Sequence, residues 1–285
     1  MDSLVGKPLS SKYNVLRKIG EGQNALVYLA EQMSMGRNVC IKVLKKHQSS
    51  DATANARFRQ EVEVSSRLRS PHTIQFYDYG SVEGRQYIVM EFLAGETIQG
   101  RLKKRGRLGL GETASVAAQI GSSLDEAHEA GVWHRDLKPE NVYFCTHATP
   151  LKPFVKVLDF GFARLTDRGS EQTRLTAQNV AVGTPAYMAP ERVVKERRVD
   201  HRSDLYSMAV MCFEMLTGHL PFSGKNPMLM LMDHVKKPIP SVHGFCKGLP
   251  LKLDEFFVRA MAKDPESRPS SGQEFNELLD RGLRG

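Results

Sequence analysis

The sequence predicts an α+β protein of two lobes: an N-terminal antiparallel sheet with one helix, and a larger, mainly helical C-terminal lobe. Three observations support this fold class. Short strand-like runs alternate with turns in the first third, a glycine in FLAGETI (92–98) interrupts that pattern, and helical periodicity dominates afterwards. We therefore expect one lobe over residues 1–92, a second over residues 93–285, and a ligand cleft between them.

Strands and one helix account for the first lobe. Short apolar runs bounded by turns predict the strands YNVLRKIG (13–20), ALVYLAEQ (25–32), NVCIKVLKK (38–46) and QYIVMEFL (86–93). Residues 52–68, between the last two strands, are expected to form the helix of this lobe, and the breaker SPH follows them.

Two helices of the second lobe are predicted from their apolar faces. Residues 112–131 end at Gly131, a plausible helix stop, and residues 203–218 end in the same way at Gly218. The apolar face of the first helix carries Val116, Ile120, Leu124 and Ala127. The second is apolar enough to be a buried central helix, with its methionines in the core.

The charge of the chain points to no particular partner. Its 40 Lys and Arg against 32 Asp and Glu leave a net charge of +8. The basic runs KVLKKH (42–47), RLKKRGR (101–107) and KERR (195–198) are dispersed and are not interleaved with aromatic residues, so we expect no nucleic-acid binding. A solvated surface, or attraction to phosphorylated or acidic partners, explains the same charge.

Cysteine spacing and hydropathy predict a cytoplasmic location. The widely separated Cys40, Cys145, Cys212 and Cys246 form no C-x-x-C pair, which argues against a zinc site or disulfides and fits a reducing compartment. The N-terminal residues lack an apolar signal core, and no uncharged apolar run reaches about 18 residues. We therefore expect no membrane span in this segment.

The segment HRDLKPEN (134–141) combines three kinds of polar side chain. Asp136 can accept a proton, Lys138 can hold a negatively charged oxygen, and Asn141 offers a carbonyl oxygen to a hard metal ion. A base, a phosphate clamp and a metal ligand together indicate phosphoryl transfer. The rest of the chain must then supply a nucleotide site.

A glycine-rich turn is the first candidate for that site. KIGEGQNALVYLA (18–30) places Gly20 and Gly22 between two strand-like runs, where backbone without Cβ atoms can approach phosphates closely. A hairpin turn without a ligand would show the same pattern. Because a strand rather than a helix follows, the turn does not predict a dinucleotide-binding fold.

Lys42 is the second candidate. It ends the strand-like run VCIK (39–42), and an amine among apolar residues needs a partner. The helix over 52–68 offers Glu61 and Glu63, of which we prefer Glu61. Taken alone, Lys42 would be interpreted as a surface strand end.

Asp159 is the third candidate. It follows the apolar start of VKVLDFGFARL (155–165), and a carboxylate near Asn141 would give Mg²⁺ a second oxygen ligand. A surface turn is the alternative for this Asp-Phe-Gly sequence. It is disfavoured because HRDLKPEN lies 18 residues upstream.

With these motifs in view, the chain resembles a protein kinase, and most closely the eukaryotic-like Ser/Thr kinases of bacteria. The resemblance runs from Gly20 to Arg268, nearly the whole length. In order, the motifs are GEGQNAL (20–26), VCIK (39–42), Glu61, HRDLKPEN (134–141), DFG (159–161) and APE (189–191). Lys138, and Thr184 in GTPAYMAPE, resemble the Ser/Thr form, and the intact APE segment is typical of kinases that seat a polypeptide substrate.

The resemblance implies a role for each catalytic residue. Asp136 would orient and deprotonate the substrate hydroxyl, and Lys138 would offset charge on the γ-phosphate of ATP. Asn141 and Asp159 would hold Mg²⁺, for which Mn²⁺ can substitute. The hydroxyl of Thr184 would contact Asp136 and Lys138.

It also implies the nucleotide pocket. Lys42, held by Glu61, would position the α- and β-phosphates, Met90 would lie at the back of the pocket, and residues 91–93 would form the hinge. The residues expected around the nucleotide are Ile19, Gly20, Gly22, Val27, Cys40, Lys42, Met90, Glu91, Leu93 and Tyr143.

Two structural pairings and one regulatory device follow from the same resemblance. Arg268 would pair with Glu191, and Asp204 would tie down the catalytic-loop backbone. Arg135 would bind a phosphate on the activation loop, which would order that loop. The candidate acceptors are Ser170, Thr173 and Thr176, of which we favour the two threonines.

Four positions depart from the family pattern. Ala25 replaces the third glycine of the turn, and Cys40 stands where the family usually has alanine above the adenine ring. Cys40 is expected to be an inert buried thiol, the alternative being a thiol that an ATP-site electrophile could label. Tyr143 replaces an aliphatic residue beneath the ring, where it could crowd the pocket or stack, and Ser65 replaces a hydrophobic packing residue.

The leading hypothesis is an active kinase that phosphorylates Ser and Thr of protein substrates and, after self-association, its own activation loop. A pseudokinase that binds nucleotide as a scaffold is the alternative, supported only by Cys40 and Tyr143. A small-molecule kinase is disfavoured by the APE segment. Thr97 stands where some kinases carry an acid that selects basic substrates, so no such preference is inferred.

Overall fold

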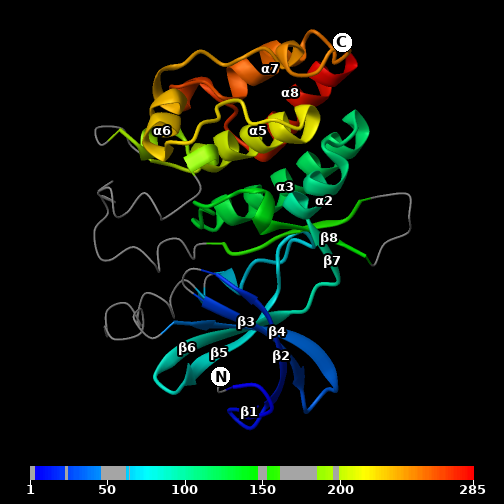
Figure 1. The fold of residues 1–285 in the computed structure, drawn as a ribbon, viewed down its shortest axis with the longest axis vertical. Coiled ribbons are helices and arrows are strands. Elements are labelled where there is room, and N and C mark those ends of the chain that lie inside the picture. Colours follow the sequence, from blue (N-terminus) through cyan, green and yellow to red (C-terminus); the bar gives the residue numbers. More distant parts are fainter. Residues whose placement is uncertain are drawn as a thin grey trace.

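A sheet-containing lobe and a helical lobe lie end to end in a computed structural model of the chain, which describes residues 4–22, 25–45, 62–63, 65–146, 153–160, 185–194 and 199–285. The N-terminus belongs to the sheet lobe, and the C-terminus lies at the opposite end of the helical lobe (Figure 1). This arrangement confirms the predicted two-lobed α+β fold.

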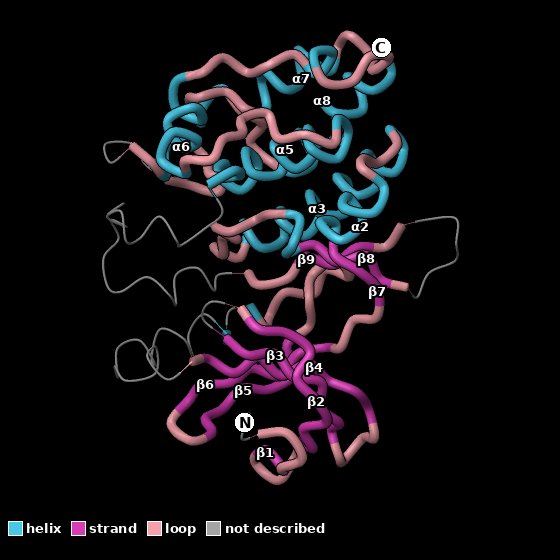
Figure 2. Tube along the Cα trace, in the orientation of Figure 1, coloured by secondary structure: helices cyan, strands magenta, loops and turns pink. Residues whose placement is uncertain are grey.

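The N-lobe contains a six-stranded antiparallel sheet with the strand order β1-β2-β3-β4-β6-β5 (Figure 2). The strands are β1 Pro8–Leu9, β2 Tyr13–Glu21, β3 Ala25–Gln32, β4 Arg37–Leu44, β5 Phe76–Val82 and β6 Arg85–Glu91. The buried side chains form two clusters. One contains Tyr13, Tyr28 and Ile41, and the other contains Val62, Ile88 and Met90.

All four predicted strands are present, with ends shifted by two residues or fewer. β5 was not predicted, because its side chains alternate between half-buried and exposed and none is fully buried, which leaves a weak apolar signal. Of the helix predicted over 52–68, residues 62, 63 and 65 are described and are helical. At residue 66 the chain turns.

The C-lobe joins a small sheet to a helical bundle. Its three-stranded antiparallel sheet has the order β7-β8-β9, formed by Gly95–Thr97, Val142–Cys145 and Val155–Val157. The helices are α2 Ile98–Arg105, α3 Leu110–Glu129, α5 Arg202–Thr217, α6 Pro227–Lys236, α7 Leu253–Ala260 and α8 Gly272–Arg284. Among the described residues, no helix has the length and apolar character needed to cross a membrane.

The two predicted helices occur as α3 and α5, and α5 is the buried central helix. Its side chains from Leu205 to Phe213 are at most 6% exposed, and its methionines lie in the core as predicted. α5 ends at Gly218, which adopts a left-handed φ of 76°. A Cβ atom at Gly218 would lie 2.8 Å from the Gly106 carbonyl oxygen, so both backbone conformation and packing favour glycine there.

The main sheet ends where the hinge was predicted. Glu91 is the last residue of β6, and its amide donates to the Gln75 carbonyl at 3.0 Å. Gly95 already pairs with Cys145 in the C-lobe sheet. The division between residues 92 and 93 remains a prediction.

Candidate active site

The glycine-rich turn connects β2 to β3. Gly20 pairs with Val27, and the Gly22 amide donates to the Ala25 carbonyl at 2.8 Å. A Cβ atom on Gly20 would lie 3.6 Å from the Val27 Cβ, and one on Gly22 would lie 3.8 Å from the Ala25 oxygen. Since both are ordinary contacts, packing within the described residues does not require glycine here, and close approach of phosphates remains as a reason. Ile19, at the start of this turn, is 37% exposed.

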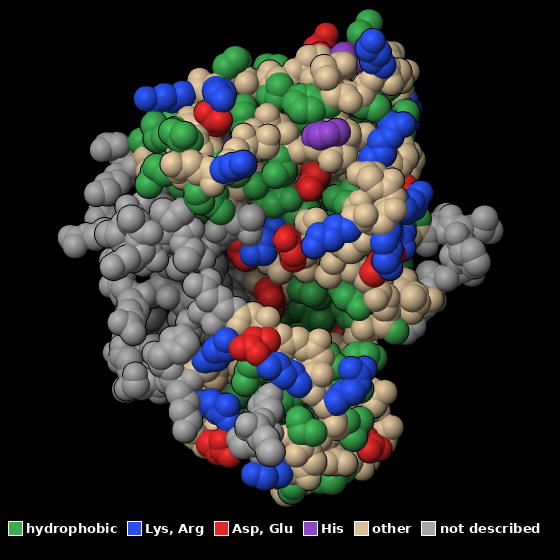
Figure 3. All heavy atoms as spheres, in the orientation of Figure 1, with side chains coloured by type: hydrophobic (Ala, Val, Ile, Leu, Met, Phe, Trp, Pro, Cys, Tyr) green, Lys and Arg blue, Asp and Glu red, His purple; other side chains and the backbone are tan. Residues whose placement is uncertain are grey.

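Lys42 and Asp159 meet where the two lobes join. The Lys42 Nζ lies 2.7 Å from the Asp159 Oδ1, although 117 residues separate them in the sequence. Desolvation raises the pKa of Asp159, but the charge and hydrogen bond of Lys42 outweigh it and hold that pKa below its ordinary value. An ionised carboxylate beside an amine suits a site for phosphates and a cation. Figure 3 shows a recess with hydrophobic side chains between the lobes on one face.

Asp204 holds the backbone of the catalytic loop, as predicted. Its two carboxylate oxygens accept hydrogen bonds from the His134 and Arg135 amides, each at 2.8 Å, and from the His128 side chain at 2.9 Å. Arg135 has a left-handed φ of 66°, a strained conformation for this residue type that these bonds maintain. The side chain of Arg192 also donates to the Arg135 carbonyl oxygen.

The base, clamp and metal ligand predicted from HRDLKPEN lie together. The Lys138 Nζ is 2.7 Å from the Asp136 Oδ2, and the Asn141 Nδ2 donates to the Asp136 carbonyl at 2.8 Å. The Leu158 amide donates to the main-chain carbonyl of Asn141 at 2.8 Å. The loop is thereby joined to the residue that precedes Asp159.

Two buried side chains, His134 and Phe160, stabilise the loop that carries Asp136. The His134 Nε2 lies 2.7 Å from the Leu158 carbonyl oxygen, and its Nδ1 lies 3.3 Å from the Asp136 amide. Burial lowers the pKa of His134, so the ring is neutral, with one donating and one accepting nitrogen. Phe160 is fully buried, with its ring centroid 4.9 Å from that of His134. Asp159 therefore faces the cleft while the next side chain packs in the core.

The predicted adenine pocket brings together residues from both lobes. Cys40 lies opposite Met90 in the sheet, and Leu93 packs against the same apolar cluster. Burial raises the pKa of the Cys40 thiol to about 12, which favours the inert interpretation of this residue. The Tyr143 hydroxyl donates to the Gly95 carbonyl at 2.8 Å, so its ring is anchored toward β7.

Sequence reasoning missed Lys156, which binds the predicted hinge. The Lys156 Nζ lies 2.7 Å from the Glu91 Oε1, and it also donates to the Thr73 carbonyl at 3.2 Å. The same Glu91 oxygen accepts the Gln75 amide at 2.8 Å, so the Glu91 side chain is occupied within the protein. A lysine between two buried valines was the available signal, by the argument already applied to Lys42.

The predicted pairing of Arg268 with Glu191 is confirmed. Two parallel hydrogen bonds of 2.8 and 2.7 Å join the guanidinium to the carboxylate, and neither side chain is exposed. Desolvation raises the pKa of Glu191, but Arg268 and the Ser203 hydroxyl outweigh it and hold that pKa below its ordinary value. This pair ties the APE segment to the connection that precedes α8.

Several predicted residues lie outside the described part of the chain. They are Glu61, Gly161, Ser170, Thr173, Thr176 and Thr184. The pairing of Lys42 with Glu61 and the contact of Thr184 with Asp136 therefore stay predictions. Ser65 is described and buried, and its predicted effect on the active arrangement is likewise untested.

Comparison with known proteins agrees with the motifs and the fold. The family model of the protein kinase domain matches residues 13–280. Serine/threonine-protein kinase pkn3 of Myxococcus xanthus is 37% identical over 98% of this chain and 51% of its own length. Serine/threonine-protein kinase PrkC of Bacillus subtilis is 32% identical over 95% of this chain and 40% of its own length. The chain thus spans about half or less of these curated relatives.

A solved structure shows the same fold over nearly the whole chain. The kinase domain of PknI from Mycobacterium tuberculosis superposes with a TM-score of 0.75 at 26% sequence identity. The match covers 97% of this chain and 98% of the PknI chain.

Proposed function

This chain belongs to the protein kinase family, and we propose that it transfers the γ-phosphate of ATP to serine and threonine hydroxyls of proteins. The observation that carries the proposal is the junction of Lys42 and Asp159 beside a loop that joins Asp136, Lys138 and Asn141. The names of the bacterial relatives support the Ser/Thr class. This complete set of polar groups speaks against the pseudokinase alternative.

The proposed chemistry divides between two neighbouring side chains. Asp136 accepts the proton of the acceptor hydroxyl and orients its oxygen for attack. Lys138, held 2.7 Å from Asp136, offsets negative charge on the transferred phosphoryl group. The Thr184 hydroxyl is proposed to contact both side chains and so to fix their positions.

Protein kinases use ATP with a divalent cation, and we assign Mg²⁺, with Mn²⁺ as a substitute, to Asn141 and Asp159. The donor set fits a hard cation, because Asp159 is ionised and the amide nitrogen of Asn141 is committed to the Asp136 carbonyl. The side-chain oxygen Oδ1 of Asn141 is then the atom left for the ion. When bound, the cation neutralises phosphate charge. We assign the remaining contacts with the nucleotide to the residues that the sequence predicted around it.

Regulation, partners and location are proposed as follows. Two copies associate and phosphorylate Thr173 and Thr176, and Arg135 binds the resulting phosphate. The substrates are proteins rather than nucleic acids, and the chain acts in the cytoplasm.

The test is transfer of labelled γ-phosphate from ATP with Mg²⁺ by the purified chain. Asp136→Asn should reduce the rate by roughly 10²–10⁴-fold and leave ATP binding largely intact, because it removes the base and not the nucleotide site. Asp280→Asn, at an exposed position of α8, is the matched control and should keep full activity. ATP binding without transfer in the wild type, or equal transfer by the Asp136 variant, would refute the proposal.

A further inference from the structure

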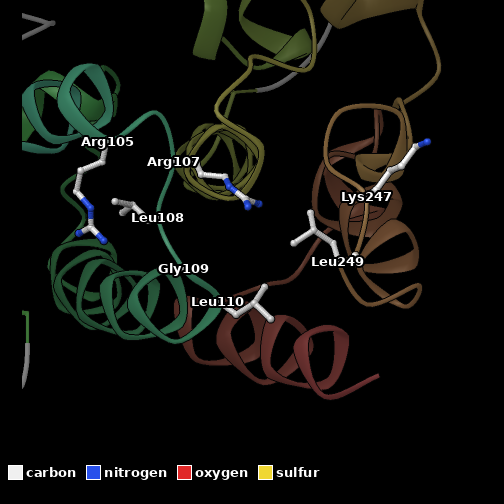
Figure 4. Close-up of a pocket in the computed structure, with 8 residues that line it drawn as sticks. Arg105, Arg107, Leu108, Gly109, Leu110, Lys247 and Leu249 are labelled. Atoms are coloured by element: carbon white, nitrogen blue, oxygen red, sulfur yellow. The ribbon is translucent and has the colours of Figure 1, made fainter.

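A basic pocket lies at the end of α2, on a surface that the proposed chemistry does not use. The cavity of about 470 Å³ is bounded by the α2–α3 connection and by the segment that precedes α7 (Figure 4). We call it the α2–α3 pocket. Its cationic and apolar lining residues are Arg105, Arg107, Lys247, Leu108, Leu110 and Leu249.

Backbone contacts hold one wall of this pocket in place. The Leu108 amide donates to the Met215 carbonyl at 2.7 Å, at the end of the buried helix α5. The Gly106 carbonyl also packs closely on Gly218: a Cβ atom on Gly218 would lie 2.8 Å from the Gly106 oxygen. Because the connection is tied to the core in this way, this wall is preformed, and a ligand would not have to order it.

Positive charge around the pocket exceeds the negative charge available to offset it. Five Lys and Arg lie between Glu96 and Glu112, and no acidic residue lies between those two. The two carboxylates are already ion-paired with Arg101, Lys104 and Arg105. Across the described ranges, Arg107 and Lys247 form no ion pair; Arg107 donates only to the Cys246 Sγ, at 2.6 Å. Figure 3 shows Lys and Arg side chains gathered along this edge of the C-lobe.

The pocket also offers apolar surface. In Figure 4 the side chains of Leu108, Leu110 and Leu249 border the cavity, and the Arg107 side chain extends into the space between them. Leu110 is 37% exposed and supplies apolar surface to a ligand, whereas Leu108 is buried at 3% exposure. Apolar surface with cationic groups around it is complementary to a peptide that carries a hydrophobic anchor among acidic residues.

The helix α3 sets the distance between this pocket and the catalytic loop. It begins at the pocket with Leu110 and ends at Glu129, five residues before His134. Its 20 residues span about 30 Å at 1.5 Å per residue. An extended peptide covers about 3.3 Å per residue, so at least about ten residues must separate a segment in the pocket from a hydroxyl at Asp136.

We propose that the α2–α3 pocket binds an acidic segment with a hydrophobic anchor in the protein substrates of this kinase, at least about ten residues from the phosphorylated hydroxyl. Its use in substrate recruitment rests on the proposed function. Binding of the segment itself does not.

Binding is tested first, without catalysis. The probe is a fluorescein-labelled peptide of eight Glu and Asp around two Leu, followed by anisotropy at low salt. Arg107→Glu and Lys247→Glu should each weaken binding by about fivefold or more, because each replaces an attraction by a repulsion. Lys103→Glu makes the same change of charge on exposed α2 outside the lining and should change binding less than about twofold. Cys246, beside Arg107, should become slower to react with a maleimide when the peptide is bound.

Three binding results would overturn the proposal. Equal binding of a peptide with Lys in place of the acids would remove the electrostatic basis. Equal binding of a peptide without Leu would indicate a site for anions only. A loss with Lys103→Glu as large as that with Arg107→Glu would indicate general attraction to a basic surface.

Recruitment is tested with a Ser-containing substrate peptide joined to the acidic segment by flexible linkers of 4 or 14 residues. The long linker should lower KM relative to the unjoined substrate, and the short linker should not. Arg107→Glu should abolish that advantage and leave kcat on the unjoined substrate unchanged. An equal effect of both linkers would contradict the docking geometry. Failure of every substrate would refute the proposed function, while the binding results would still decide the pocket.

Discussion

Arg268→Met tests how the protein depends on its buried ion pair. The substitution keeps an unbranched side chain and removes the guanidinium that makes two hydrogen bonds to Glu191. It also removes the donor to the Ala262 carbonyl, at 2.7 Å. Glu191 would keep the Ser203 hydroxyl as a partner at 2.6 Å.

The expected loss follows from burial. Both side chains are fully buried, so no water can replace the missing cation. Breaking a buried pair by removing one partner costs about 3–5 kcal/mol, because the remaining charge is left uncompensated. Since a domain has about 5–15 kcal/mol of stability in total, this change removes a large share of it.

Urea unfolding provides the measurement, and Trp133 provides the signal, because it is the one tryptophan of the chain. At pH 7 the free energy of unfolding of Arg268→Met should be lower than that of the wild type by the amount above. The double variant Glu191→Gln with Arg268→Met should regain part of the loss, because it removes the buried charge.

The pH dependence of stability tests the same reasoning independently, because it should have opposite directions in the wild type and the variant. In the wild type the pKa of Glu191 is held low, so its contribution to stability is present above its ordinary value of 4.5 and is lost as pH falls below it. In Arg268→Met desolvation acts with little opposition and raises that pKa, so the variant should regain stability between pH 7 and 5. A loss below about 1 kcal/mol, or a double variant no more stable than the single one, would refute the reasoning.

Two further predictions concern other buried or anchored side chains. Burial lowers the pKa of His234 to about 4, so the stability that depends on its neutral ring is complete above 6.5 and is lost as pH falls toward 4. Over that range the free energy of unfolding of His234→Phe, which cannot titrate at this position, should fall by up to about 3 kcal/mol less than that of the wild type. Urea titrations of the two proteins measure this, and an equal fall in both would contradict it. Tyr143→Phe removes the hydrogen bond to Gly95 and should lower stability by about 0.5–1.5 kcal/mol, seen as a lower Tm. An unchanged Tm would mean that the bond makes no net contribution.

The elements that the sequence predicted well are those with a local pattern. The strands over 13–20 and 25–32 and the helix around Ile120 are encoded by the spacing of apolar residues, which reflects burial on one face. Gly218 ends its helix as predicted, because a left-handed residue stops a helix wherever it occurs. β5 was missed because its polar and glycine residues weaken that spacing.

The catalytic loop was predictable for a similar reason, since Asp136, Lys138 and Asn141 are close in the chain. The roles proposed for them rest on side-chain chemistry, and their juxtaposition follows from a short loop. The sequence also indicated that Lys42 needed a partner, but it could not indicate that Asp159 would lie 2.7 Å away.

Contacts between distant segments were decided by the tertiary structure alone. Folding brings Lys156 to Glu91, and it brings Lys247 beside the basic run that ends at Arg107. It also buries Cys40 in part, and this burial raises the pKa of its thiol. Local patterns encode which face of a strand or helix is buried, whereas these contacts depend on how whole elements pack, and desolvation depends on every atom around the group.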